Sequence, residues 1–345
     1  MSRWAAVLAG GSGTRFWPLS TPACPKQFLP LTGDDPLLRQ AVQRLHGLVP
    51  TERIMVVTGA AFADQTRALL PELPPENVLG EPQPAGTGPA LTWATHVIGE
   101  RDAAATVLSL HADWHIGDGA AFRQTASQAL DAAENHDVLV TVGIVPTRPE
   151  IGYGYIEPGD PLDDHARRVA RFVEKPDRER AAELMTRGAL WNSGLFAWTA
   201  SRFFTETVEH AIEIAPHVDT LARRGPAAFF AAVTPVVIDI SHFERSRRVA
   251  VVPGRFDWDD VGTWASLHRV RPADANGNVR VGHAVTHDAE RCVVWAEDGP
   301  VVLDGVRDLV VVRANGITLV TTPERASHLK TLLEHLPDEL RAPQP

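Results

Sequence analysis

Residues 8–28 read LAGGSGTRFWPLSTPACPKQF, and this stretch decides how the first part of the chain folds. Apolar residues 5–8 predict a buried strand that runs directly into a loop with three glycines. Such a loop brings bare backbone N–H groups close to a ligand, and the concavity suits phosphate oxygens. The glycines alone would also fit a tight turn. Arg15 and Lys26 follow them, however, and two cations beside a glycine loop favour phosphate binding.

The loop matches neither of two well-known phosphate-binding motifs. It is not a P-loop, because no Gly-Lys-Ser/Thr follows the glycines. It is not a dinucleotide fingerprint, because Phe16 stands where the third glycine would be.

The composition limits the function classes. The 345 residues carry a net charge of −10, which argues against a general nucleic-acid or membrane-surface binder. The sequence has no signal-peptide pattern and no apolar run of the about 18 residues that a transmembrane helix needs. The two cysteines, Cys24 and Cys292, are too few for a disulfide framework and lack metal-site spacing. We therefore expect a cytoplasmic protein without nucleic-acid or membrane partners.

Lysine is scarce, and its positions are informative. The chain has 30 Arg but only three Lys, and its first 33 residues contain no Asp or Glu. Lys26 in PKQF and Lys175 in VEKP therefore indicate places where a compact ammonium is needed and a planar guanidinium does not fit. Chance retention of two lysines is the plain alternative.

Strand-like and helix-like segments alternate over the first 145 residues. This alternation predicts a doubly wound, mostly parallel α/β sheet, in which ligands bind beyond the carboxyl ends of the strands. The expected strands are 5–8, 54–58, 106–110 and 138–144, with helices over 37–48, 61–70, 89–100 and 120–135, and further strands near 154–156, 169–173 and 195–198.

From about residue 276 the pattern changes to short Val-rich segments separated by Gly, Asn and Asp. This pattern predicts a small all-β domain of the β-helix type, closed by a helix over 324–336. The expected division is a catalytic domain over 1–270, the small β domain with its helix over 276–336, and a flexible tail over 337–345.

Six further stretches follow residues 8–28 in a fixed order. They are GEPQPAGTGPA, LSLHADWHI, TVGIVPTRPEIGYGYIE, FVEKP, LWNSGLFAW and FDWDDVGTW. Together the seven motifs resemble those of the sugar-phosphate nucleotidyltransferases, specifically the mannose-1-phosphate guanylyltransferases. The resemblance implies a Rossmann-like, doubly wound mixed sheet of the GT-A type with a small C-terminal β domain. It also implies the short monofunctional form, because 345 residues leave no room for the isomerase domain of longer relatives.

The resemblance implies a reaction and a set of site residues. GMP would pass from GTP to α-D-mannose 1-phosphate by in-line attack on the α-phosphate, giving GDP-mannose and pyrophosphate. Arg15 would stabilise the pyrophosphate charge, Lys26 would bridge phosphate oxygens, and Asp113 and Asp260 would hold Mg²⁺. From the residues alone, Asp113 could be a plain turn residue and Asp260 a helix N-cap. The implied nucleotide contacts are Leu8, Gly10, Gly11, Ser12, Gly13, Thr14, Glu81, Gly86 and Asp113.

Glu81 indicates which base is bound. Guanine presents two adjacent donors, and a carboxylate accepts from both with its two oxygens, whereas uracil and thymine place carbonyls beside their single N–H. A surface glutamate is the alternative. Gly86 would let the backbone approach the base edge. The segment departs from the family pattern, because the Arg and Asn that many members carry there are absent.

The sugar phosphate is expected over the middle of the chain. Tyr153 and Gly154 would lie near the sugar ring, Glu174 and Asn192 would bind its hydroxyls, and Lys175 would pair with its phosphate. A solvated ion pair is the alternative for Glu174 and Lys175.

Two other functions stay open at this point. The chain could use another base or another sugar 1-phosphate, such as a heptose or glucose phosphate, or it could be an inert subunit that senses sugar nucleotides. Family resemblance also implies a homodimer.

Overall fold

The computed structural model describes residues 2–11 and 14–341, apart from the side chain of Thr14. The described residues form two compact units, each assembled from separated stretches of the chain. The first unit lies within Met1–Gly10, Ala41–Ala112 and Asp118–Phe256, and the second lies within Gly11–Gln40, Asp113–Gly117 and Asp257–Pro345. The expected domain division near residues 270–276 stays a prediction, and these units cut the chain differently, because the glycine-loop segment groups with the C-terminal region.

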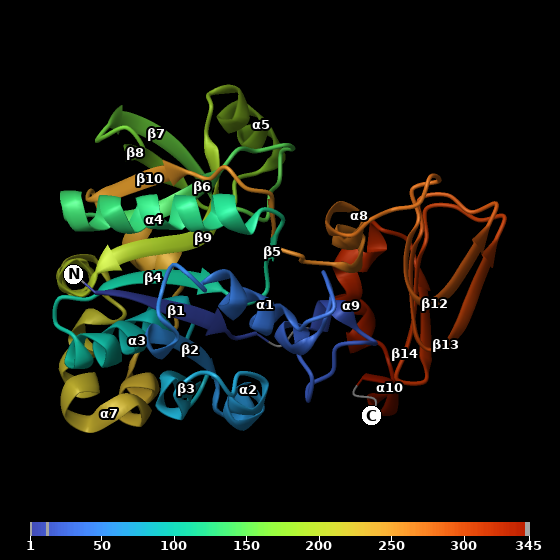
Figure 1. Ribbon diagram of the computed structural model, residues 1–345, viewed down its shortest axis with the longest axis horizontal. Helices are drawn as coiled ribbons and strands as arrows, with labels where there is room; N and C mark the ends of the chain where they lie inside the picture. Colours follow the sequence, from blue (N-terminus) through green and yellow to red (C-terminus); the bar gives the residue numbers. More distant parts are fainter. Residues whose placement is uncertain (1, 12–13, 342–345) are drawn as a thin grey trace. The chain divides into compact units, whose positions relative to one another are not determined.

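A nine-stranded sheet with the order β3-β2-β1-β4-β9-β6-β10-β8-β7 builds the first unit (Figure 1). Strand β1 lies between β2 and β4 and is buried from its second residue onward, as expected for a strand covered on both faces. The strands are β1 Arg3–Ala9, β2 Ile54–Gly59, β3 Val78–Glu81, β4 Thr106–His111, β6 Leu139–Ile144, β7 Tyr155–Pro161, β8 Arg167–Val173, β9 Leu190–Thr199 and β10 Val249–Pro253.

The sheet is mixed, which confirms the fold class that the family resemblance implies. Strands β1, β2, β3 and β4 are mutually parallel, and β6 is parallel to β10, but β9 runs antiparallel between β4 and β6. The alternation over the first 145 residues predicted parallel strands, and β1, β2, β3, β4 and β6 do run in one direction, whereas the antiparallel strand β9 comes from later in the chain. Periodicity reveals strands but not their direction, so the inserted antiparallel strand could not be seen.

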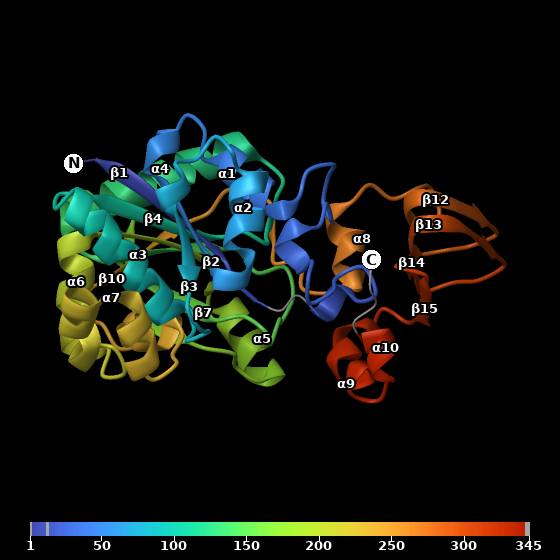
Figure 2. The same ribbon diagram turned by 90° about the horizontal axis from the view of Figure 1, so that it is seen from below.

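Helices cover both faces of this sheet. Helix α4 packs on β4, β6, β9 and β10, whereas α3, α6 and α7 pack together on the opposite face, α3 against β1 (Figure 2). Aromatic residues fill the core on the side of α3, including an edge-to-face pair of Trp93 and Phe230. The helices of the described chain are α1 Leu37–Arg44, α2 Ala63–Leu69, α3 Thr87–Arg101, α4 Gly119–His136, α5 Arg178–Thr186, α6 Ala200–His210, α7 Val218–Ala232, α8 Leu267–Val270, α9 Leu329–Glu334 and α10 Asp338–Arg341.

The second unit contains the small β domain that the sequence predicts. Its sheet has the order β12-β13-β14-β15, and β12, β13 and β14 are parallel, as in a β-helix. A short pair, β5 with β11, belongs to the same unit. The bounds are β5 His115–Ile116, β11 Trp258–Asp259, β12 Val279–His287, β13 Val293–Asp304, β14 Val310–Ala314 and β15 Ile317–Thr321.

The glycine-loop segment contributes to the core of this second unit. The buried rings of Phe16 and Trp264 meet edge to face, with centroids 5.1 Å apart, and Trp264 in turn packs on Trp295. The indole N–H of Trp264 donates to the carbonyl of Trp17 at 3.0 Å. These contacts explain why residues 11–40 group with the C-terminal region.

The structure also bears on membrane association. Among the described residues, no helix combines the length and the apolar character needed to cross a bilayer.

Candidate active site

Lys26 is the centre of the polar group in the second unit. It starts a short 3₁₀ turn, Lys26–Phe28, and is buried, with 8% of its surface exposed. Its ammonium donates to Asp113 Oδ2 at 3.0 Å and to the carbonyl oxygen of Asp260 at 2.7 Å. The structure thus brings together three residues that the sequence singled out. A buried ammonium with two oxygen partners is fixed in position, which suits a group that must meet phosphate oxygens.

A two-residue strand pair holds the two aspartate segments side by side. His115 of β5 pairs with Asp259 of β11, and Ile116 pairs with Trp258. Asp113 lies two residues before β5, and Asp260 directly follows β11. The pairing therefore fixes both aspartates at one end of a short antiparallel ribbon.

The turn at Asp260 has an unusual backbone. Val261 has a φ of +46°, a conformation that β-branched residues rarely adopt, and such strain is often found at functional sites. Asp259 supports the turn, because its Oδ1 accepts the N–H of Val261 at 2.8 Å while Arg269 pairs with the same carboxylate. Asp260 does not cap the following helix. Thr263 occupies that position, which removes the alternative left open by the sequence.

The glycine loop is described only in part. Arg15 is exposed in the turn Thr14–Phe16. Gly11 has a φ of +105° with open space where a Cβ would point, so its backbone conformation is what favours glycine there. Ser12 and Gly13, both predicted phosphate contacts, lie outside the described residues, as does the side chain of Thr14.

In the first unit, Glu81 ends β3 and faces the end of β1. A Cβ built on Gly10 would lie 4.0 Å from Glu81 Oε2, and Leu8 is the residue of β1 that pairs with Val57 of β2. Burial raises the pKa of the Glu81 carboxyl to about 7. A desolvated carboxyl of this kind gains much from two hydrogen-bond donors, such as those that guanine presents.

Gly86 is required by close backbone packing. It has a φ of +85°, and a Cβ there would lie 2.5 Å from the carbonyl oxygen of Val236. The backbone of Val236 forms two hydrogen bonds with the same loop. Its N–H donates to the carbonyl of Ala85, and its carbonyl accepts from the N–H of Gly88. The loop that begins α3 is therefore fixed in shape, whether or not it contacts a base.

A second polar group in the first unit contains the predicted sugar-phosphate residues. Lys175 pairs with Glu174 at 2.8 Å, and the lysine side chain is 62% exposed, so its ammonium is accessible. The Lys175 backbone has a φ of +45°, again in the left-handed region. Glu174 folds over Gly154, where a Cβ would lie 2.7 Å from its Oε2. The glycine therefore makes room for the carboxylate.

Asn192 joins this group through a residue that the sequence reasoning missed. Its Nδ2 donates to Asp239 Oδ1 at 2.6 Å, and its Oδ1 accepts from the hydroxyl of Thr141 at 2.9 Å. Burial, and next the nearby charge of Glu174, raise the pKa of Asp239 to about 6. The signal for Asp239 was present in PVVIDISHF, where one carboxylate interrupts an apolar run.

Tyr153 packs against Trp191 of β9. Its ring meets Trp191 edge to face with centroids 5.2 Å apart, and the guanidinium of Arg148 lies 5.1 Å from the centroid of that Trp191 ring. Trp191 is buried and packs against both side chains.

The comparisons with known proteins agree with this geometry. The family model described as nucleotidyl transferase matches residues 4–277, and the model described as the MannoseP isomerase/GMP-like beta-helix domain matches residues 282–336. The chain belongs to the nucleotidyl transferase family. Its relatives within that family narrow the assignment further.

The chain is 36% identical over 344 residues to the alginate biosynthesis protein AlgA of Pseudomonas aeruginosa, which covers 96% of this chain and 71% of AlgA. It is also 36% identical over 353 residues to the mannose-1-phosphate guanylyltransferase of Escherichia coli K12, which covers 96% of this chain and 73% of the relative. Both relatives are longer than this nucleotidyl transferase, so the monofunctional form stays a prediction.

A solved structure supports the fold along almost the whole chain. The mannose-1-phosphate geranyltransferase from Thermus thermophilus superposes with a TM-score of 0.87 at 34% identity, covering 97% of this chain and 99% of that one. The fold class, with its C-terminal β-helix-like domain, is therefore confirmed.

Proposed function

We propose that this nucleotidyl transferase transfers GMP from GTP to α-D-mannose 1-phosphate, giving GDP-mannose and pyrophosphate. The observation that carries the proposal is the double hydrogen bond of buried Lys26 to Asp113 and to the carbonyl of Asp260. It joins three residues of the expected phosphate chemistry, in a chain that resembles mannose-1-phosphate guanylyltransferases along nearly its full length.

The base would be selected by Glu81. In its ionised form this carboxylate accepts hydrogen bonds from the N1–H and 2-amino groups of guanine. Uracil or thymine would place a carbonyl oxygen against it, and the buried carboxylate would then lack a donor. Gly86 supports the selection by allowing the loop before α3 to pass close to Val236.

The phosphates would be bound by Lys26, Arg15 and the glycine loop. The reaction needs no covalent nucleophile, so the protein's part is to position two anions and to stabilise the charge that develops on pyrophosphate. An oriented cation such as Arg15 contributes about 3–4 kcal/mol when it acts on that charge. Lys26 cannot be replaced by arginine in such a role, because its buried position and its two partners fit a compact ammonium.

The donor set at Asp113 and Asp260 fits Mg²⁺. This ion binds hard oxygen donors and commonly uses one or two carboxylates, with substrate phosphates and water as its other ligands. Bound there, Mg²⁺ would neutralise phosphate charge. The chain's own contribution is rigidity, since Lys26 and the ribbon of β5 and β11 hold both aspartate segments in place.

The sugar phosphate would be bound by the group around Asn192. Lys175 would pair with the sugar phosphate, and Glu174 and Asn192 would bind hydroxyls of the ring, with Tyr153 and Gly154 beside it. Asp239 is a positioning residue in this scheme, because it fixes the amide of Asn192 by a 2.6 Å hydrogen bond.

A homodimer and a cytoplasmic location stay predictions. Size-exclusion chromatography with light scattering tests the dimer, and fractionation of the source cells tests the location.

The proposed reaction is tested by pyrophosphate release with Mg²⁺ over a matrix of substrates. GTP, ATP, UTP and dTTP are each combined with mannose, glucose and fucose 1-phosphates. Turnover confined to GTP with mannose 1-phosphate supports the proposal. Turnover with another pair overturns the specificity assigned to Glu81 and Asn192. Nucleotide binding without turnover of any pair would favour a sensing subunit instead.

A further inference from the structure

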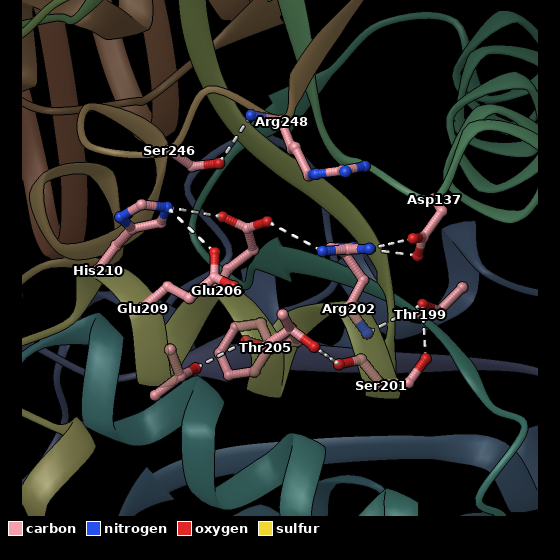
Figure 3. A network of polar contacts seen from close by, with 12 residues as sticks. Asp137, Thr199, Ser201, Arg202, Thr205, Glu206, Glu209, His210, Ser246 and Arg248 are labelled. Atoms are coloured by element: carbon pink, nitrogen blue, oxygen red, sulfur yellow. Dashed lines mark hydrogen bonds and ion pairs between the residues drawn. The ribbon is translucent and has the colours of Figure 1, made fainter.

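The carboxyl end of α6 carries three side chains with metal-ligand chemistry that the reaction does not use. Glu206, Glu209 and His210 occupy positions i, i+3 and i+4, so they share one face of the helix. One carboxylate oxygen of each glutamate and one ring nitrogen of the histidine all lie within 4.8 Å of one another (Figure 3). Among the described residues, these are the three His, Cys, Asp or Glu side chains whose donor atoms come this close together.

The donor atoms lie close to the spacing of a tetrahedral metal site. His210 Nε2 lies 3.3 Å from Glu206 Oε2 and 3.8 Å from Glu209 Oε2. Zinc bonds to nitrogen and oxygen are about 2.0–2.2 Å long, which puts neighbouring ligands of a tetrahedron about 3.3–3.6 Å apart. The distance from His210 to Glu206 lies in this range, the distance to Glu209 is slightly longer, and the two glutamate oxygens lie within 4.8 Å of each other. Small side-chain movements would therefore let the three atoms bind one cation.

Glu206 supplies an independent indication of a ligand. Its side chain is 1% exposed, and within the described residues its Oε2 accepts no hydrogen bond, although His210 Nε2 is nearby. A buried carboxylate oxygen without a donor is costly unless a proton or a cation lies beside it. The other oxygen, Oε1, faces Arg202 at 3.4 Å, and Arg202 is in turn paired with Asp137 (Figure 3). This chain of contacts aims Oε2 at His210.

The cluster lies away from the sugar-phosphate group of the same unit. Asp137 lies two residues before β6, and Arg248 directly precedes β10. The Arg248 carbonyl accepts from the N–H of Leu139, so both residues lie at the amino edge of these parallel strands. Asn192, in contrast, pairs with Gly143 near the carboxyl end of β6. A cation at the cluster would therefore have no direct part in binding the sugar.

We propose that Glu206, Glu209 and His210 bind one divalent cation of the zinc class, with water as the remaining ligand. Imidazole with two carboxylates suits Zn²⁺ and its neighbours in the first transition series, whereas Mg²⁺ prefers an all-oxygen set. Glu209 and His210 are 58% and 30% exposed, which leaves the ion an entry path. The positive charge of Arg202 beside Glu206 lowers the affinity, so the site binds more weakly than a structural zinc site.

The test is direct binding of Zn²⁺ to the full chain. Chelator-treated protein is titrated with Zn²⁺ by calorimetry in buffer that contains excess Mg²⁺, and bound metal is counted after dialysis. Glu209→Gln and His210→Gln remove one ligand each. His165→Gln is the matched control, because His165 is an exposed histidine outside the cluster.

The proposal expects one Zn²⁺ per chain in wild type and in H165Q, with affinity reduced about tenfold or more in E209Q and H210Q. Co²⁺ bound to wild type should show the visible absorption of a low-coordinate N/O site, and that absorption should be lost in H210Q. Equal Zn²⁺ affinity in all four proteins would overturn the proposal. The absence of saturable Zn²⁺ binding to wild type would also overturn the proposal. The contact between Glu206 and His210 would then be explained by a shared proton without a metal ion. Glu209 is exposed, so E209Q stays informative even if changes at His210 disturb folding.

Discussion

The ammonium of Lys26 lies 3.0 Å from Asp113 Oδ2, although the two residues are 87 positions apart along the chain. The same ammonium donates to the carbonyl of Asp260, which comes from a third part of the sequence. One lysine therefore organises the group to which the phosphate chemistry is assigned. The chain has only three lysines, so a substitution at Lys26 is the most sensitive test of the idea that the phosphate site requires an ammonium group.

Lys26→Arg should reduce kcat/KM by about 100-fold or more, because a guanidinium is too large and too planar for the buried space between Asp113 and the Asp260 carbonyl. The matched control is Lys330→Arg, at an exposed position of α9. Both variants are assayed by pyrophosphate release with thermal melts recorded in parallel. Full activity in K26R would show that a generic positive charge is enough.

Binding of GTP should depend on pH through Glu81. Burial raises the pKa of this carboxyl to about 7, so the free protein carries an ionised Glu81 above that pH and a protonated one below it. Guanine's two donors need the ionised form. The Kd for GTP should therefore be flat above pH 7 and rise by about tenfold per pH unit well below it.

Glu81→Gln isolates this effect. The variant should bind GTP more weakly at pH 8, and the Glu81-dependent change with pH should vanish, since glutamine does not titrate in this range. Fluorescence titration with a GTP analogue across about pH 5.5–8.5 measures both curves. An unchanged pH profile in E81Q would remove Glu81 from guanine recognition.

Asp239→Asn should weaken sugar-phosphate binding without affecting the nucleotide. The change removes the negative charge of the group that accepts a hydrogen bond from the Asn192 amide, so Asn192 is held less firmly. The KM for mannose 1-phosphate should therefore rise about tenfold, while the KM for GTP stays within about twofold. The raised pKa of Asp239 indicates that the fold tolerates a neutral group there, so the melting temperature should not fall. Asp219→Asn, on the exposed side of α7, is the control. Equal rises in both KM values would contradict a positioning role.

Gly86→Ala should destabilise the first unit by at least about 2 kcal/mol, because the new Cβ would meet the Val236 carbonyl at 2.5 Å in addition to adopting a positive φ. Gly188→Ala is the matched control. Gly188 has a similar φ of +78° but open space around its Cβ, so the cost there should be about 1 kcal/mol. Urea unfolding followed by tryptophan fluorescence measures both, and equal costs would show that the contact with Val236 relaxes freely.

Local patterns predicted much of this molecule. The strand before the glycine loop, the helices over 87–101 and 119–136, and the Val-rich β domain were each visible as runs or periods of apolar residues. The residues of the polar groups other than Asp239 were found because they stand in recognisable motifs. Strand β3, with only four residues, gave no comparable signal and was missed.

Contacts between distant segments could not be predicted in this way. The packing of Phe16 and Trp17 on Trp264 joins residues 11–40 to the C-terminal region, and periodicity carries no information about such pairs. Asp239 was missed for the same reason. It is a single carboxylate in an apolar stretch, and its partner Asn192, 47 residues away, becomes visible only when the chain is folded.

The central claim is tested most directly by following the phosphorus atoms of GTP. The protein is incubated with Mg²⁺, mannose 1-phosphate and GTP labelled either at the α- or at the γ-phosphorus, and the products are separated by anion exchange. The account predicts that the α-label appears in GDP-mannose and the γ-label only in pyrophosphate. A γ-label in inorganic phosphate without labelled GDP-mannose, or no transfer of the α-label from GTP at all, would contradict it.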